Sequence, residues 1–143
     1  MTTAEENKRI ARQYPEEVAT GRNVDLIDEL VTDDFVEHGG PFDEDRHGRE
    51  ADKEQIRSIL EAFPDFEATS IRTVGEGDYV ATHFTYSGTH DGEFMGIPAT
   101  GTHVEVSGMA IDRIEDGKIV ERWGDADMLG VLQQVGAIDL DGE

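Results

Sequence analysis

The segment Lys118–Gly136, KIVERWGDADMLGVLQQVG, begins with the alternation of a β-strand and ends with the apolar spacing of a short helix. Strand alternation predicts one face made of Ile119, Glu121, Trp123, Asp125 and Asp127. An aromatic wall beside two carboxylates suits a small-molecule pocket in which a proton is transferred. We therefore expect the rest of the chain to build a cavity around this strand.

Three helices are predicted before the strands. Thr3 fits a capping box at the start of the first helix, and Pro15 should kink or divide that helix. Asn23 can cap a second, apolar helix. The third helix has apolar residues at i, i+3, i+4 and i+7, namely Ile56, Ile59, Leu60 and Phe63.

The second half of the chain has the pattern of an antiparallel meander. Strands are predicted over residues 66–74, 79–89, 102–114 and 119–127, and Asp116-Gly117 is a strong hairpin signal between the last two. A short helix follows at residues 128–135. Helices followed by strands indicate an α+β fold, with helices packed on one side of a curved sheet. We expect residues 1–143 to form a single domain with a cavity at the mouth of that sheet.

The charge of the chain is unusual. It has 33 acidic and 12 basic residues, for a net charge of −21. Molar salt screens such self-repulsion, so we expect a protein from a high-salt cytoplasm whose melting temperature rises with salt. The charge argues against nucleic acid or anionic membranes as partners. No apolar run approaches the roughly 20 residues of a membrane span, and the polar N-terminus is unlike a signal peptide, so a cytoplasmic location is predicted.

Asp127 is the main candidate for acid/base chemistry. Near Trp123 and other apolar side chains, its carboxylate would have a raised pKa and could exchange protons with a ligand. However, Asp127 also precedes the helix at Met128, where it would cap the helix and its pKa would be lowered. Spacing alone does not decide between these roles. Asp125 is a second candidate on the same predicted face.

Two histidines are candidates for hydrogen-bond donors or proton relays. His38 opens a glycine-rich loop, and His90 ends a strand before the loop that contains Phe94 and Met95. Alternatively, His38 is a partly buried structural histidine whose ring forms hydrogen bonds with the backbone. No metal-ligand spacing such as H-x-H or HExxH is present, and there is no cysteine, so a bound transition metal is not expected.

The candidate pocket consists of aromatic and large apolar side chains. Such residues can equally be core or dimer contacts. The candidates are Trp123, Phe35, Phe63, Tyr86, Phe94, Met95 and Met109.

Four motifs together resemble one known family. DDFVEH, GTHDGEFMGIPATG, IDRIEDGKIVERW and DMLGVLQQVG are similar, in this order, to segments of SnoaL-like polyketide cyclases, in the nuclear transport factor 2-like superfamily. The resemblance runs from about Arg9 to Gly136. It implies a cone-shaped, curved mixed sheet with about three helices around a pocket, and a homodimer formed through the open face of the sheet.

The resemblance also implies a reaction. In it, a carboxylate removes a proton α to a carbonyl, donors hold the enolate, and a polyketide-like ester closes its ring without metal or cofactor. The acid/base aspartate of the family falls on Asp127, and its histidines fall on His38 and His90; Tyr86 is a further candidate donor. Gly124 and Ala126 stand where many relatives have bulkier residues.

Two alternatives remain open on the same scaffold. A carboxylate could activate water for epoxide opening, which requires several polar groups around one water molecule. A non-catalytic protein that binds a hydrophobic small molecule would instead have a purely apolar cavity, with Asp125 and Asp127 facing solvent or capping the helix.

Overall fold

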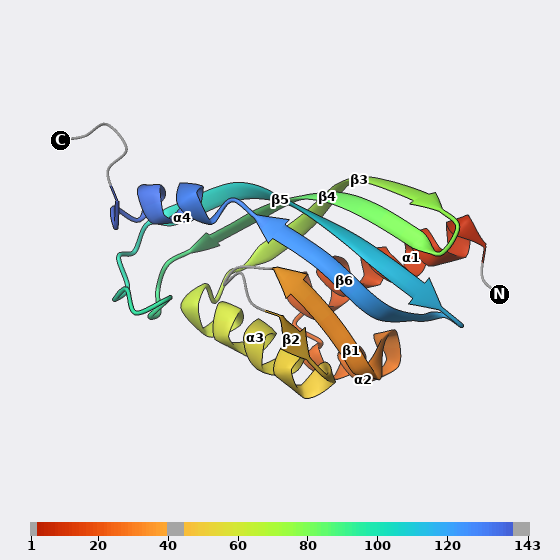
Figure 1. Cartoon of the computed structure of the whole chain (residues 1–143). Helices are drawn as coiled ribbons and strands as arrows, with labels where there is room; N and C mark the ends of the chain where they lie inside the picture. The colour runs from red at the N-terminus through yellow and green to blue at the C-terminus, as the bar shows by residue number, and fades with distance from the viewer. Residues whose placement is uncertain (1–2, 40–44, 139–143) are drawn as a thin grey trace.

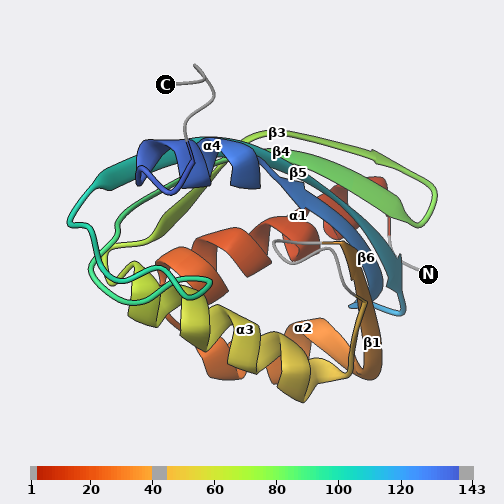
Figure 2. The ribbon, with the colours of Figure 1, turned by 60° about the vertical axis from the view of Figure 1, so that its left-hand side comes forward.

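A curved sheet lies over helices on its concave side in this structure, a computed structural model that describes residues 3–39 and 45–138 (Figures 1 and 2). The strand order is β2-β1-β6-β5-β4-β3. Strands β1 and β6 are parallel, and the other neighbours are antiparallel. The strands are β1 Val31–Gly39, β2 Arg46–His47, β3 Glu67–Glu76, β4 Tyr79–Thr89, β5 His103–Glu115 and β6 Lys118–Ala126.

The helices occupy the N-terminal half, apart from one short helix after β6. The α+β fold with a cone-like curved sheet is therefore confirmed. The short strand β2 falls in a segment for which the sequence predicts no regular structure. The helices are α1 Ala4–Gln13, the π-helix η1 Tyr14–Thr20, the 3-10 helix η2 Val24–Leu26, α2 Ile27–Leu30, α3 Arg49–Ala62 and α4 Met128–Gln134.

The first helix is divided at Pro15. Thr3 and Glu6 form the predicted capping box of α1. Because proline has no N–H to donate, the α-helical ladder is interrupted there, and η1 continues with π geometry. Asn23, in contrast, makes no capping bond, and the helix that it was predicted to start is only a 3-10 turn followed by a single turn of α-helix.

A β-bulge in β6 changes which side chains face inward. Asp116 and Gly117 both have positive φ and form the predicted hairpin turn between β5 and β6. Along the pair, Arg113 is opposite Glu121, but Ile114 is opposite Ile119, so Val120 is an extra residue. The alternation therefore reverses at Val120. Ile119 and Arg122 are both buried, although they are three positions apart.

Two hydrophobic clusters fill the space between the sheet and the helices. The first joins α1, η1, α2, α3 and the sheet around Val18, Ile27 and Phe35. The second lies near α4 and includes Phe63, Phe94 and Val131. Within the described residues, no helix is long and apolar enough to cross a membrane.

Candidate functional site: an apolar cavity with a buried polar end

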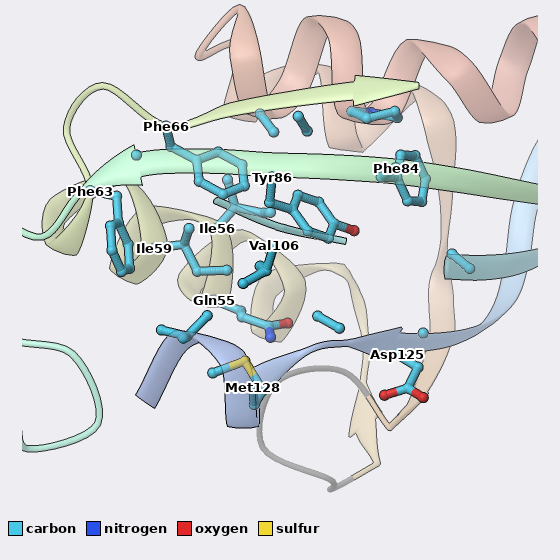
Figure 3. A pocket seen from close by; sticks show the side chains of 18 of the residues that line it. Gln55, Ile56, Ile59, Phe63, Phe66, Phe84, Tyr86, Val106, Asp125 and Met128 are labelled. Atoms are coloured by element: carbon cyan, nitrogen blue, oxygen red, sulfur yellow. The ribbon is translucent and has the colours of Figure 1, made fainter. Parts of the chain in front are cut away.

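The cavity lies between the two hydrophobic clusters and has a volume of about 160 Å³. Its walls come from the concave face of the sheet, from α3 and from the start of α4, and most of them are apolar (Figure 3). Gly124 and Ala126 both line it, so the small residues of β6 leave room there. The apolar lining includes Ile56, Ile59, Phe63, Phe66, Phe84, Phe94, Val104, Val106, Met128 and Val131.

Four buried polar side chains line the cavity, each from a different element. Tyr14 starts η1, Glu37 lies on β1, Gln55 lies on α3 and Arg122 lies on β6. All four are buried. Glu37 and Arg122 are partners in the parallel register of β1 and β6, which brings their side chains to the same face. Glu37 also forms an ion pair with Arg46 of β2, with 2.9 Å between Oε1 and Nη2.

Tyr14, Glu37 and Arg122 form the polar end of the cavity. There, Tyr14 donates a hydrogen bond to Asp52 of α3. The distance from its hydroxyl oxygen to Asp52 Oδ2 is 2.6 Å. Asp52 is only 1% exposed, and its other oxygen, Oδ1, has no hydrogen-bond partner among the described residues. Burial raises the pKa of Asp52 from its ordinary value of 3.8 to about 6, against the opposing effect of Arg122. Burial likewise raises the pKa of Tyr14 well above its usual value.

Arg122 is held by an ion pair with its cross-strand partner. Its Nε donates to Oδ1 of Asp112 at 2.5 Å, and both side chains are buried. Its guanidinium group also lies 3.9 Å from the centre of the Tyr14 ring, a cation–π contact. Burial raises the pKa of Asp112, and the charge of Arg122 opposes that rise.

Tyr86 forms the aromatic roof of the cavity between Phe66 and Phe84. Burial raises its pKa to about 12. A Cβ atom at Gly108 of β5 would lie 2.4 Å from the Tyr86 ring. Glycine at this position therefore lets the ring pack directly on the backbone of the neighbouring strand.

Of the two roles predicted for Asp127, the structure shows the helix cap. Its Oδ1 accepts a hydrogen bond from the backbone N–H of Gly130 at 2.8 Å, so it caps α4. It does not appear among the residues that line the cavity. Asp125 does line it, but at the margin. Its side chain is exposed and is set apart from the aromatic residues in Figure 3.

His38 and Trp123 lie on the outer face of the sheet rather than in the cavity. His38 follows the inward-facing Glu37, so its ring points outward, where Nε2 is 2.6 Å from Glu121 Oε2 and Nδ1 is 3.0 Å from Asp45 Oδ1. Its ring also stacks on Trp123 with 5.5 Å between the ring centres. The expected wall of the pocket, Trp123, is 38% exposed because the bulge at Val120 places Arg122 inward and Trp123 outward.

The other predicted residues are divided between the cavity and its surroundings. His90 is fully buried, bonds through Nδ1 to Thr100 at 2.9 Å and packs against Phe63, outside the cavity lining. Phe35 is part of the first core cluster, and Met95 is exposed in its loop. Phe63, Tyr86, Phe94 and Met109 do line the cavity, although Met109 is 59% exposed on the opposite face.

The polar end of the cavity was not predicted from the sequence. A signal for Glu37 was present, because it alternates with Phe35 on the buried face of β1. The same signal existed for Asp52, which precedes Ile56 by four residues on the buried side of α3. No group of three or more potential metal-ligating side chains occurs in the described part of the chain.

Known proteins share this architecture. The model of the SnoaL-like polyketide cyclase family matches residues 8–135. The chain belongs to this family. No match was found among curated proteins.

Several solved structures agree with the family membership. IdmH of Streptomyces antibioticus, a proposed polyketide cyclase, is 33% identical, with a TM-score of 0.79 over 91% of this chain and 98% of that one. AclR of Streptomyces galilaeus, a proposed hydroxylase, is 26% identical, with a TM-score of 0.84 over 95% and 84% of the two chains. A SnoaL-like protein from Jannaschia sp. CCS1 shares the fold at 23% identity, with a TM-score of 0.85 over 97% and 98%.

Proposed function

We propose that the chain is a cyclase- or isomerase-type enzyme that performs acid/base chemistry α to a carbonyl in this cavity. The observation that carries the proposal is an apolar cavity that ends on a buried carboxylate, Glu37, beside a buried donor group, the guanidinium of Arg122. Family membership and the likeness to IdmH, itself a proposed polyketide cyclase, support the same class of chemistry.

The proposed reaction is an aldol-type ring closure. Glu37 removes a proton from the carbon next to a carbonyl, and the guanidinium group of Arg122 holds the enolate oxygen that forms. The enolate carbon then bonds to a second carbonyl carbon of the same molecule. The resulting alkoxide recovers the proton from Glu37, so the ring-closed product is an isomer of the substrate.

In this proposal Glu37 takes the carboxylate role first assigned to Asp127. The reason is geometric, since a base must reach the proton that it removes. Asp127 is occupied as the cap of α4, whereas Glu37 lines the cavity. Asp125 is the second carboxylate at the margin and is the alternative base.

The test uses a short acyclic diketone whose ketone carbons are separated by three methylenes. Its ring closure followed by loss of water gives a methylcyclohexenone, which absorbs in the ultraviolet. We expect catalysed closure by the wild-type protein, and a loss of about a hundredfold or more in Glu37→Gln. Asp127→Asn serves as the matched control that retains the activity, and Asp125→Asn tests the alternative base. If Glu37→Gln closes the diketone as fast as the wild type, Glu37 is not the base.

Water activation for epoxide opening is the second candidate. Glu37 and Gln55 both line the cavity, and a carboxylate and an amide could together position one water molecule. Under this alternative, styrene oxide would be converted to its diol and the diketone would not be closed. A protein that only binds its ligand would convert neither compound.

We further propose that the outer face of the sheet forms a homodimer. Val74, Ala81, Ile111 and Trp123 are consecutive register partners across β3, β4, β5 and β6, and all but Ala81 are large side chains that are exposed. A second copy of the chain would bury this apolar row. Sedimentation should report a dimer for the wild type and a monomer for Ile111→Lys. A wild-type monomer would rule the dimer out.

A further inference from the structure

Arg122 presents two free donor nitrogens to the cavity. The only side-chain hydrogen bond of Arg122 within the described residues runs from Nε to Asp112. Nη1 and Nη2 have no such partner, yet they are not among the fully enclosed unpaired atoms, so they keep accessible surface. Because the residue is 6% exposed and lines the cavity, that surface faces the cavity. A ligand atom that accepts hydrogen bonds is the missing partner.

The guanidinium group is fixed in position before any ligand arrives. Asp112 holds one edge through the bond to Nε. The rings of Tyr14 and Phe35 pack on the group, with their centres 3.9 Å and 5.7 Å from Cζ. A donor pair that is already oriented loses little conformational entropy on binding, so it can select the position of a ligand oxygen.

The charges around Arg122 favour a neutral ligand. Arg122 and Arg46 are balanced by Asp112 and Glu37, with ion pairs between Arg122 and Asp112 and between Arg46 and Glu37. The remaining charged group at this end is Asp52, which is neutral when protonated and otherwise adds a negative charge. A carboxylate ligand would therefore add negative charge to a buried site that is already balanced or negative. A carbonyl oxygen accepts the same hydrogen bonds without that cost.

The size of the cavity sets the size of the ligand. A volume of about 160 Å³ is close to the roughly 150 Å³ of an engineered apolar cavity that binds benzene. Pockets for drug-sized molecules are several times larger, at about 300–1,000 Å³. The rings of Phe63, Phe66 and Tyr86 form a large part of the wall, so the ligand is expected to be largely apolar.

From these observations we propose that the cavity binds a neutral carbonyl compound about the size of a single ring, with its carbonyl oxygen on Nη1 and Nη2 of Arg122. This names the substrate class for the proposed acid/base function and rests on that function taking place in the same cavity. It differs from the multi-ring substrate that a polyketide cyclase would take.

Binding to the wild-type protein tests the proposal without any turnover. Four probes are titrated by calorimetry or by ligand-observed NMR: acetophenone, ethylbenzene, benzoate and acetylanthracene. We expect acetophenone to bind at least about tenfold more tightly than ethylbenzene, which lacks the oxygen, and than benzoate, which is charged. Acetylanthracene should not bind. Tighter binding of benzoate overturns the proposed neutrality, and tight binding of acetylanthracene overturns the proposed size.

A conservative variant tests the role of Arg122 itself. Arg122→Lys keeps the positive charge beside Asp112 but removes the planar pair of donors. We expect it to lower the affinity for acetophenone about tenfold and to leave that for ethylbenzene unchanged. Arg113→Lys, on the outer face, is the matched control and should change neither affinity. Equal effects of Arg122→Lys on both probes would overturn the assigned contact.

The two proposals can fail separately. Acetophenone binding with these preferences, together with no closure of the diketone, would reject the proposed reaction and retain the ligand class. Closure of the diketone together with tight binding of acetylanthracene would retain the proposed reaction and reject the proposed size of the ligand. If Arg122→Lys does not fold, the comparison of the four probes on the wild type still decides the ligand class.

Discussion

The two faces of the sheet use the same kinds of residue in opposite environments. On the inner face, Arg122 pairs with Asp112 and both side chains are buried. On the outer face, Arg113 pairs with Glu121 and Glu115, where the side chains keep a quarter or more of their surface. Arg113 and Arg122 are both on the β5–β6 hairpin. The comparison shows that their environments, rather than their chemical type, decide which pair belongs to the candidate site.

The largest effect is expected where the inner pair is broken. Asp112→Ala leaves the Arg122 guanidinium buried without its partner, so we expect a loss of about 3–5 kcal/mol in the free energy of unfolding. Arg113→Gln on the outer face is the matched control, with a change within about 1 kcal/mol because exposed pairs are screened by water. Urea unfolding of both variants measures the difference. Similar losses would show that the two faces do not differ as described.

On the inner face, the buried carboxyl group of Asp52 should make the free energy of unfolding depend on pH. Asp52 has a folded-state pKa of about 6 and an ordinary value of 3.8, so between these values the folded state binds the proton and the unfolded state releases it. Its contribution to stability therefore falls as pH rises from about 4 to 6, by about 3 kcal/mol, which is opposite in sign to an acid in a favourable ion pair. Asp52→Asn cannot ionise and should lose this slope. Urea midpoints from pH 4 to 8 measure it, with Asp125→Asn as the control.

The fold was predictable because its signals are local and agree with one another. The apolar period around Ile56 and Ile59 predicted α3, and alternation predicted β4, β5 and β6 to within one or two residues. The turn at Asp116-Gly117 was also explicit, because it needs two residues that tolerate positive φ. These features depend on neighbours in the sequence, which a single chain displays directly.

The site was less predictable because it depends on register and tertiary contact. The single extra residue Val120 reverses the alternation of β6, so the predicted faces of Trp123 and Arg122 were exchanged. The contact of Tyr14 with Asp52 joins residues 38 positions apart. A buried charge of this kind looks like a surface charge in the sequence, since only the fold shows that it has a buried partner.

The third prediction separates the two aspartates that follow Trp123. Asp127 accepts the Gly130 N–H at the start of α4, so Asp127→Ala should lower the free energy of unfolding by about 1 kcal/mol. The side chain of Asp125 is exposed and makes no hydrogen bond among the described residues, so Asp125→Ala should have almost no effect. Urea unfolding compares the two variants. Equal values would mean that the cap does not stabilise the helix.

The smallest effect is expected for His38 on the outer face. Hydrogen bonds to Glu121 and then to Asp45 raise the pKa of His38 above its ordinary value. Its stabilising contribution is fully present below the unfolded-state pKa of about 6.5 and is lost as pH rises through the higher folded-state pKa. Unlike the slope from Asp52, this one lies on the neutral to alkaline side and should shrink in high salt, because the ring is partly exposed. Urea midpoints of the wild type and His38→Gln at pH 6 and pH 8.5 measure the contribution. If the urea midpoint of His38→Gln changes between pH 6 and pH 8.5 as much as that of the wild type, the pH dependence comes from another group.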